Sequence, residues 1–337
     1  MPDLGVEVVE SIDQIRAAEW DTLCGKRPFI DHRWLRMVES VLSHHEARYV
    51  LLRRDGHLTA SAVCGLERRF EHPALRRRAS WVLNRFPYLR CSIPIALETG
   101  LIVGDGQVLE LLAAVHRLAR RERALLTAFG HLTPDNPVWP TLRGGGYRQL
   151  SRWWSTALPV SWASFDDYLA SRTTADRKEI GRLRRRAARD GISVEHGPLQ
   201  PNDAPVLRGL IDNVLARHGA PDPYIRDFLQ SASIILDGDL HVVQARRAGE
   251  TVGCAVLVKS QGELLAKWAG MDYQKTHNSA AYHALLIDCI NLAIELGVHR
   301  LRLGATAYST KQQFGAVPEE RLNVLALPAW LAGVLPG

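Results

Sequence analysis

The chain has 337 residues, about twice the length of a common domain, so we expect two domains with a sizeable core in each. Hydrophobic residues make up 46% and charged residues 23%, as in an ordinary globular protein, and no apolar run approaches the length of a membrane-spanning helix. Lys and Arg exceed Asp and Glu by 42 to 36, and the resulting net charge of +6 weakly favours an anionic partner such as coenzyme A, a phosphorylated substrate or RNA.

The cysteines argue against a zinc site and against a disulfide framework. The five of them are scattered, without C-x-x-C spacing or a neighbouring cluster of histidines, so no metal is expected. Cys64, Cys254 and Cys289 lie among apolar neighbours and are predicted to be small core residues. No leader of charged and then apolar residues begins the chain, and the cytoplasm is therefore the expected compartment.

The first part of the chain alternates predicted strands and helices. Residues 5–10 are a predicted strand, followed by a helix that Ser11 or Asp13 could cap. A second short helix is expected over residues 32–42. Two alternating runs then flank Asp55-Gly56, a strong indication of a β-hairpin.

An internal repeat relates the two halves of the chain. Five residues around the first hairpin recur 193 residues later: Arg53, Arg54, Gly56, Ala62 and Val63 match Arg246, Arg247, Gly249, Ala255 and Val256. A predicted helix and strand, residues 108–121 and 124–129, match residues 282–296 and 300–303 in the same order. We therefore predict two copies of one α/β unit with a mixed sheet, residues 1–155 and residues 156–330.

The first copy differs from the second in its last turn. That turn reads NPVWPTLRGGGY over residues 136–147 and has no counterpart of Lys311. The three glycines at 144–146 give a flexible turn, but they do not join a strand to a helix, so a phosphate-binding loop is not predicted there.

A basic helix is expected over residues 174–190. Its apolar stripe is Ile180, Leu183 and Ala187, and seven bases cover most of the remaining circumference. The bases are Arg177, Lys178, Arg182, Arg184, Arg185, Arg186 and Arg189. Two interpretations remain open: a solvated face whose charges extend into water, or a site for phosphate or an RNA backbone.

The stretch from His241 to Gly315 is the most informative. It predicts two strands joined by an Ala-Gly-Glu turn, a third strand, a long helix ended by Gly297, another strand, and a short helix ended by Gly315. A long helix between two parallel strands is a right-handed crossover, and we expect these strands to separate around a ligand.

The order of these elements resembles a known family. Together with Lys-Trp-Ala-Gly at 267–270 and K-x-x-F-G-A from Lys311 to Ala316, it is similar to the catalytic half of the Fem-type (FemAB-like) N-acyltransferases of the GNAT superfamily. The resemblance covers roughly residues 160 to 328 well. It implies an α/β fold of two tandem GNAT-like domains, in which the first domain shapes the substrate site and the second contains the chemistry.

The resemblance also implies a set of site residues. Lys311 would steady an oxyanion or an acceptor phosphate, and Tyr308, one turn earlier, would relay a proton. From the residues alone, Lys311 could instead be an exposed helix lysine, and Tyr308, Trp268 and Tyr273 could be packing aromatics. Substrate-binding candidates are Lys267, Trp268, Asp272, Tyr273, Asn278, Tyr224 and His218; candidates for a donor phosphate or RNA are Lys275, Arg177, Lys178 and Arg185.

The acyl donor is the least defined part of this prediction. Acyl-CoA acetyltransferases have Q/R-x-x-G-x-G/A after the third strand, and its backbone amides bind the pyrophosphate at a helix N-terminus. Here residues 274–280 are QKTHNSA, so both glycines are missing and close approach of the backbone is limited.

We therefore predict an N-acyltransferase that forms an amide by direct transfer to a small-molecule amine, with no permanently bound cofactor. The expected donor is an acyl thioester, either acyl-CoA or acyl-carrier protein. Aminoacyl-tRNA is the alternative donor, and a non-catalytic protein that binds RNA or another anion is the rival from a different class.

Overall fold

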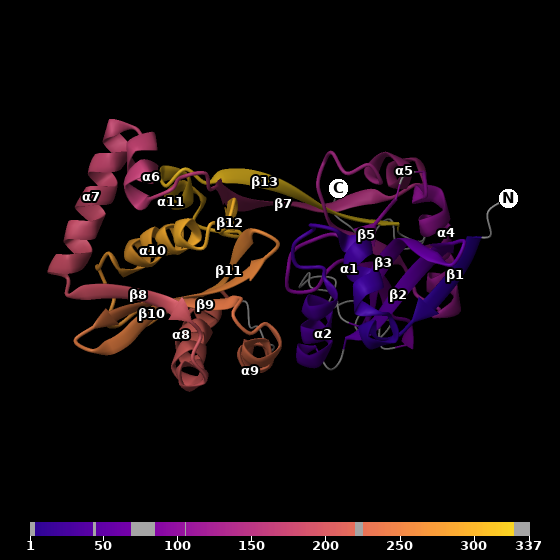
Figure 1. The fold of residues 1–337 in the computed structure, drawn as a ribbon, viewed down its shortest axis with the longest axis horizontal. Helices are drawn as coiled ribbons and strands as arrows, with labels where there is room; N and C mark the ends of the chain where they lie inside the picture. Colours follow the sequence, from indigo (N-terminus) through magenta and orange to yellow (C-terminus); the bar gives the residue numbers. More distant parts are fainter. Residues whose placement is uncertain (1–3, 43–44, 69–84, 105, 220–224, 327–337) are drawn as a thin grey trace. The chain divides into compact units, whose positions relative to one another are not determined.

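A computed structural model describes residues 4–42, 45–68, 85–104, 106–219 and 225–326 (Figure 1). The chain divides into two compact units, residues 1–153 with 320–337, and residues 154–319. The chain passes from the first unit to the second after residue 153, two residues before the boundary at residue 155 that the sequence predicted. Residues 320–326 lie in the first unit, because β13, the strand that contains them, pairs there with β6, whereas the sequence-based division assigned them to the second.

The first unit contains a mixed sheet in the order β1-β2-β3-β4-β6-β13. All its pairs are antiparallel except β4 with β6, and a short β5 pairs with β3. The strands are β1 (Leu4–Val9), β2 (Glu46–Arg54), β3 (His57–Glu67), β4 (Tyr88–Cys91), β5 (Leu101–Ile102), β6 (Thr127–Leu132) and β13 (Val317–Ala326). The hairpin predicted at Asp55-Gly56 is confirmed by β2 and β3.

In the described ranges, five named helical segments accompany this sheet. They are η1 (Ile12–Gln14), α1 (Ala17–Cys24), α2 (His32–Val41), α4 (Val108–Arg121) and α5 (Trp139–Gly144). Helix α4 connects toward β6 and buries Leu111, Val115 and Leu118 at helical spacing, while Leu109 on its other side is exposed. The first predicted helix is divided in two, because Ser11 caps the short η1 and α1 starts only at Ala17.

The second unit repeats the arrangement in the order β8-β9-β10-β11-β12-β7. Here β11 and β12 are parallel and the other pairs are antiparallel. The strands are β7 (Arg148–Pro159), β8 (Ile192–Pro198), β9 (Leu240–Arg247), β10 (Glu250–Ser260), β11 (Glu263–Met271) and β12 (Arg300–Arg302). The boundary predicted between residues 155 and 156 thus falls within a strand, β7, whose residues 157–159 pair with β12.

Helices cover both faces of the second sheet (Figure 1). They are α6 (Phe165–Ser171), α7 (Thr174–Arg189), η2 (Pro201–Asp203), α8 (Ala204–Arg217), α9 (Ile225–Ile235), α10 (Ala281–Glu295) and α11 (Tyr308–Gln313). Helix α10 is apolar around most of its circumference and packs between the sheet and α7. Helix α8 lies against β11 on the other face, where a Cβ on Gly270 would come within 2.8 Å of the Leu210 and Ile211 backbone. Close approach of this helix therefore requires the glycine of the Lys-Trp-Ala-Gly strand.

Two further expectations can be compared with the described residues. Cys64, Cys254 and Cys289 are buried core residues, as predicted. None of the helices in the described ranges is both long enough and apolar enough to cross a membrane.

Candidate active site

The strands β11 and β12 pair over only three residues each. Glu263, Leu264 and Leu265 face Arg300, Leu301 and Arg302, and the register ends there. Beyond β12 the chain leaves β11 but stays bonded to β7, where the Leu303 N–H donates to the Thr156 carbonyl over 2.8 Å. Thr156 also donates two hydrogen bonds to the Gly304 carbonyl, one from its N–H over 3.0 Å and one from Oγ1 over 2.7 Å. The end of β12 is thus held on the side away from β11.

Lys311 lies under this turn. Its side chain is buried, with 4% of the residue exposed, and Nζ lies 2.7, 3.2 and 2.8 Å from the carbonyl oxygens of Leu303, Gly304 and Ala305. An ammonium group has three hydrogens to donate, so these three carbonyls use all of them. The alternative of an exposed helix lysine is wrong. Lys311 instead fixes three successive carbonyls at the end of β12.

The charge of Lys311 is affected by its burial. Desolvation lowers the pKa of the ammonium to about 8, while the carbonyl acceptors favour the protonated form. No carboxylate forms an ion pair with it in the ranges that the structure describes. A cation without an ionic partner therefore lies at the strand end, where GNAT-type chemistry would develop negative charge.

The loop between β12 and α11 is strained. Thr306 and Ala307 have φ values of 69° and 45°, which are unfavourable for residues with a Cβ and most of all for a β-branched one. Conformations of this kind cost about 1–3 kcal/mol each and occur often at active sites. The bonds from Lys311 and Thr156 offset this cost by holding the loop from both sides.

Tyr308 begins α11 and is partly exposed. Its hydroxyl donates to the Trp154 carbonyl over 2.8 Å, so the oxygen keeps its capacity to accept a hydrogen bond from a ligand. Tyr308 and Lys311 both belong to α11, but the one side chain bonds toward β7 and the other toward the end of β12. No hydrogen bond joins the two side chains among the described residues.

The substrate-binding candidates on β11 pack together. The Lys267 ammonium lies 5.3 Å from the centre of the Trp268 ring, and that ring meets Phe228 of α9 edge to face at 4.5 Å. Trp268 is buried, which fits the packing alternative. Tyr273 lies under the Arg217 guanidinium at 4.2 Å, and the neighbouring His218 is exposed at the end of α8. The remaining candidate, residue 224, lies outside the described residues.

The loop before α10 is closed by its own side chains. The Asp272 carboxylate accepts hydrogen bonds from the N–H groups of Gln274 and Lys275, both at 3.0 Å. The Lys275 ammonium pairs with Glu250, and the Lys275 carbonyl accepts a bond of 2.6 Å from Arg247. Asp272 therefore shapes the loop, and Lys275 is already neutralised where a donor phosphate was expected to meet it.

A carboxylate occupies the N-terminus of α10. Asp190, at the end of α7, accepts a hydrogen bond from the Ala280 N–H over 3.0 Å. Arg186 donates to the carbonyl of Asn278 over 2.5 Å and lies 3.8 Å from Asp190. Asn278 has a φ of 55°, which turns its carbonyl toward α7. The N-terminus of α10, where the resemblance predicts the pyrophosphate of an acyl-CoA donor, thus has a carboxylate of the protein itself bound to the Ala280 N–H.

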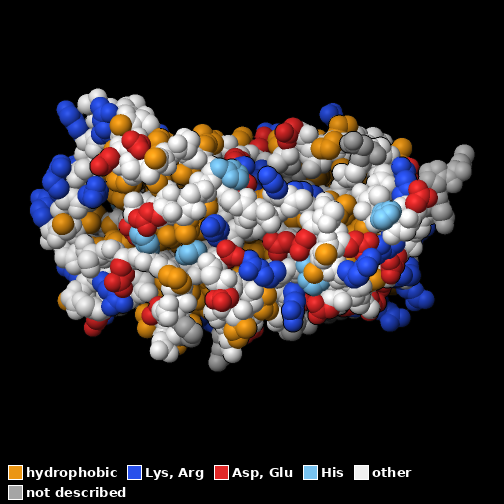
Figure 2. Space-filling model, viewed as in Figure 1, with side chains coloured by type: hydrophobic (Ala, Val, Ile, Leu, Met, Phe, Trp, Pro, Cys, Tyr) orange, Lys and Arg blue, Asp and Glu red, His pale blue; other side chains and the backbone are white. Residues whose placement is uncertain are grey.

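The predicted basic helix is α7, and its bases divide into paired and unpaired groups. Arg177 bonds to Ala170 and Thr174, Arg182 pairs with Glu179, and Arg184 lies over the Phe165 ring. Lys178, Arg185 and Arg189 are exposed and have no partner in the described ranges. With Arg182 these three residues follow a spacing of four, three and four, which places them on one face of the helix. Figure 2 shows Lys and Arg side chains gathered over α7 at the left of the view.

Several residues of the site were not predicted from the sequence. Arg186 had been named only as a base of the predicted helix 174–190, and neither Asp190 nor Thr156 had been assigned a role. Their partners Ala280, Asn278 and Gly304 lie 90 residues or more away in the chain, so no local pattern indicates the contacts. The described residues contain no cluster of His, Cys, Asp and Glu able to hold a metal ion.

Comparison with known proteins identifies the fold. The acetyltransferase (GNAT) domain model matches residues 175–312. The crystal structure of FemX superposes with a TM-score of 0.68 and 13% identity, over 96% of this chain and 98% of FemX. A tandem GNAT protein from the clavulanic acid biosynthesis pathway gives 0.57 and 14%, over 97% and 100% of the two chains.

A third similar structure is a domain of a larger enzyme. The C-terminal domain of a putative lysylphosphatidylglycerol synthetase from Agrobacterium fabrum superposes with a TM-score of 0.57 and 14% identity, over 95% of this chain and 94% of that domain. No curated protein sequence matches this chain significantly. At such identities the structural likeness establishes the fold, and it confirms the predicted pair of GNAT-like units. Residues 175–312 thus match the GNAT domain family, and the chain as a whole has the tandem fold of the GNAT superfamily.

Proposed function

We propose that this protein is an N-acyltransferase whose second unit contains the reaction site and whose donor is an aminoacyl-tRNA. The observation that supports this donor is the hydrogen bond from Ala280 to the Asp190 carboxylate at the N-terminus of α10. This contact argues against acyl-CoA. The order of donors expected from the sequence, with the thioester first, is therefore reversed in this proposal.

The argument against acyl-CoA is electrostatic as well as steric. A pyrophosphate needs free N–H groups at the helix N-terminus, and here the Ala280 N–H is already used. Two unit charges of the same sign about 4 Å apart repel each other by about 4 kcal/mol at an effective dielectric constant of 20. A diphosphate next to Asp190 would meet this repulsion, and no glycine lets the loop backbone approach it more closely.

The argument for a polyanion rests on α7. Lys178, Arg185 and Arg189 lie on one exposed face and extend over about 16 Å of helix. The same helix reaches the loop before α10 through Arg186 and Asp190. A nucleic acid bound along α7 could therefore bring its 3′ end to the region between β11 and β12, with its phosphates on unpaired cations.

The reaction would proceed without a covalent enzyme intermediate. The nitrogen of a neutral amine attacks the carbonyl carbon of the aminoacyl ester, the C–O bond to the ribose breaks, and the amine proton passes to the leaving ribose oxygen. We assign proton relay to the Tyr308 hydroxyl, whose oxygen can accept. Lys311 acts as a positioning residue that holds the Leu303–Ala305 carbonyls, and its charge adds a favourable field for the oxyanion.

Donor binding can be measured before the acceptor is known. Isothermal titration with coenzyme A and filter binding with aminoacyl-tRNA test the wild-type protein, Asp190→Ala and Asp190→Asn. We expect tRNA binding at micromolar concentrations and no coenzyme A binding up to about 1 mM in the wild type. Asp190→Ala should bind coenzyme A more tightly than Asp190→Asn, since asparagine removes the charge but still accepts from Ala280.

Asp166→Ala is the matched control, because Asp166 is an exposed acid in the first turn of α6. Micromolar binding of coenzyme A to the wild type would overturn the donor assignment. Binding of a carrier-protein thioester without any binding of tRNA would return the thioester to first place. If neither tRNA nor any thioester bound, the acyltransferase proposal itself would be contradicted.

A further inference from the structure

The first unit contains a hollow that takes no part in the chemistry proposed for the second. Its volume is about 610 Å³, within the range of small-molecule sites. The residues around it come from α5, from the first half of β7, from the start of β13 and from the turns beside them. They are Pro134, Trp139, Arg143, Gly146, Tyr147, Arg148, Gln149, Arg152, Glu320 and Leu322.

One wall of this hollow is rigid. Tyr147 is buried, and its hydroxyl forms a hydrogen bond of 2.7 Å with His116 Nε2. The Tyr147 ring also stacks on His116 and meets Phe129 edge to face at 5.3 Å. Leu322 of β13 is buried beside the same space. The flat faces around the hollow are thus fixed before any ligand arrives.

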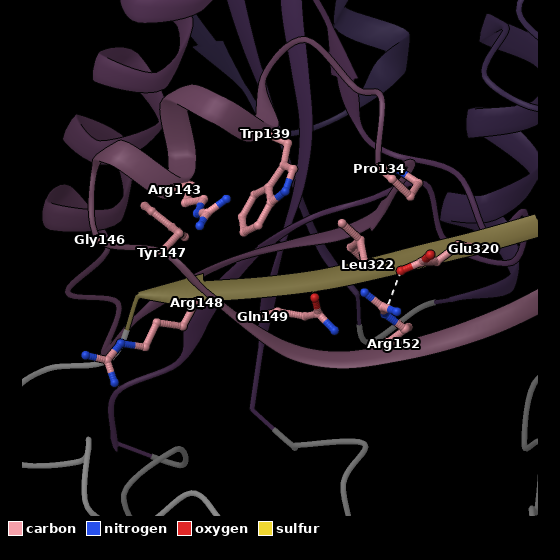
Figure 3. A pocket seen from close by; sticks show the side chains of 10 residues that line it. All are labelled: Pro134, Trp139, Arg143, Gly146, Tyr147, Arg148, Gln149, Arg152, Glu320 and Leu322. Carbon is pink, nitrogen blue, oxygen red and sulfur yellow. Dashed lines mark ion pairs between the residues drawn. The ribbon is translucent and has the colours of Figure 1, made fainter. Parts of the chain in front are cut away.

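The charges around the hollow are unbalanced. Arg152 is neutralised by Glu320, with 2.6 Å between Nε and Oε1. Arg143 and Arg148 have no partner in the part of the chain that the structure describes. In Figure 3 the Arg143 guanidinium lies between the rings of Tyr147 and Trp139, whereas Arg148 extends away from Trp139. One central guanidinium is therefore available, with a second at the rim.

We propose that this hollow binds a planar aromatic ligand that has one oxyanion, a carboxylate or a phosphate. The oxyanion lies on Arg143, whose planar fork of donors matches such a group. The ring packs against the Trp139 indole and Leu322. The amide of Gln149 supplies one donor and one acceptor to polar atoms on the ring edge, which favours a heteroaromatic ring.

This site is independent of the proposed transfer reaction. It needs no residue of the second unit, and a wrong donor assignment would leave it unchanged. The Gly144–Gly146 run, which was excluded as a nucleotide loop, has a different role here: it ends α5 and places Gly146 and Tyr147 at the wall.

Ligand-observed NMR and calorimetry can test the proposal on the full chain with four defined probes. The two phosphate probes are uridine 5′-monophosphate and adenosine 5′-monophosphate, and the two carboxylate probes are benzoate and indole-3-carboxylate. Uridine, adenosine, benzamide and indole-3-carboxamide are the respective uncharged counterparts. At least one anionic probe should bind with a Kd below about 1 mM, its neutral counterpart about tenfold more weakly, and binding should weaken as salt is added.

Substitutions then locate the site. Arg143→Gln should weaken binding by about tenfold or more, Trp139→Leu by about fivefold, and the rim variant Arg148→Gln by only about twofold. Arg54→Gln, an exposed arginine of β2 that also has no described partner, should leave the Kd unchanged. Thermal melting should show all four variants folded, since the three arginines are exposed and Trp139, which packs against the core, is only partly buried and is replaced by another apolar residue.

The probes that bind identify the source of the oxyanion. Binding by both nucleotides alone assigns a phosphate ligand, and binding by the aromatic acids alone assigns a carboxylate. The proposal is overturned if none of the four anions binds with a Kd below about 1 mM, or if a probe that binds the wild type binds Arg143→Gln equally well.

Discussion

The two units end in the same turn but differ at its buried position. Helices α5 and α11 each have six residues, and the turns after them are closed identically. Tyr147 donates to the Leu142 carbonyl as Ala316 donates to the Lys311 carbonyl, both over 3.1 Å, and Gly146 and Gly315 have φ values of 86° and 90°. Leu142 thus occupies in the first unit the position of Lys311 in the second, and both are buried.

This difference shows what the fold requires and what it does not. The turn accepts an apolar side chain in one unit, so the backbone does not need a cation at that place. In the second unit a buried ammonium is retained at the cost of its hydration, and three carbonyls of a strained loop are arranged around it. We infer that the charge serves the reaction, and that the first unit, with leucine there, does not catalyse it.

Lys311→Leu is the most direct test, because it gives the second unit the residue of the first. The protein should fold, while the rate of transfer should fall at least 100-fold as the field and the loop geometry are lost. Circular dichroism checks the fold and an amide-formation assay checks the rate. Gln312→Leu, at the exposed neighbouring position, is the control. A rate within threefold of the wild type would remove Lys311 from the mechanism.

The second prediction compares the surface charges of the two units. Replacing Lys178, Arg185 and Arg189 by glutamine should weaken tRNA binding about 10- to 100-fold at low salt, and the slope of log K against log salt should decrease by about two to three. The control replaces Arg54, Arg117 and Arg120, three exposed arginines of the first unit, and removes the same charge. Equal losses in both triple variants would mean that only net charge matters.

The two matching glycines should differ in their tolerance of alanine. Gly146→Ala places a Cβ at positive φ in open space and should cost about 1 kcal/mol of unfolding free energy. Gly315→Ala has the same backbone strain, and its Cβ would also overlap the Arg172 guanidinium, so we expect about 2 kcal/mol. Chemical denaturation measures both. A cost for Gly146→Ala as large as that for Gly315→Ala would contradict the role of Arg172.

The last prediction concerns the pH dependence of stability. Because the folded pKa of Lys311, about 8, is below its unfolded value, the unfolded state binds more protons between about pH 8 and 10.5. Stability should therefore rise with pH in this window by about 1–3 kcal/mol relative to Lys311→Leu, and the difference should be constant below pH 7. Denaturation of both proteins from pH 6 to 10 measures it. A flat difference would mean that the pKa of Lys311 is unchanged by folding.

Local patterns were sufficient for much of the fold. Asp55-Gly56 located the first hairpin, and Leu111, Val115 and Leu118 made α4 recognisable from its spacing. Two elements were overlooked although their signals are present: Ile192, Val194 and His196 alternate along β8, and Leu207, Leu210 and Ile211 have helical spacing in α8. No local pattern indicates that β13 belongs to the first unit, because the tertiary fold determines which strands pair.

The site could be anticipated only in part. Lys311 was selected because residues 311–316 match the motif K-x-x-F-G-A, but its burial under three carbonyls depends on how the chain turns after β12. The missing glycines of QKTHNSA directed attention to the loop before α10. The Asp190 carboxylate at the N-terminus of α10 could not be predicted, because Asp190 reaches Ala280 only through the packing of α7 against α10.

The pairing of β13 with β6 has a consequence for how the protein is made. The first unit obtains its last strand from residues 317–326, so its sheet cannot be completed when residue 153 has left the ribosome. At about 5–20 residues per second, synthesis of the intervening chain takes roughly 10–30 seconds, during which the edge of β6 that faces away from β4 lacks its partner β13. Such an edge can pair with other chains, and chaperones that shield it should therefore raise the yield of folded protein more than any stabilising change in the second unit.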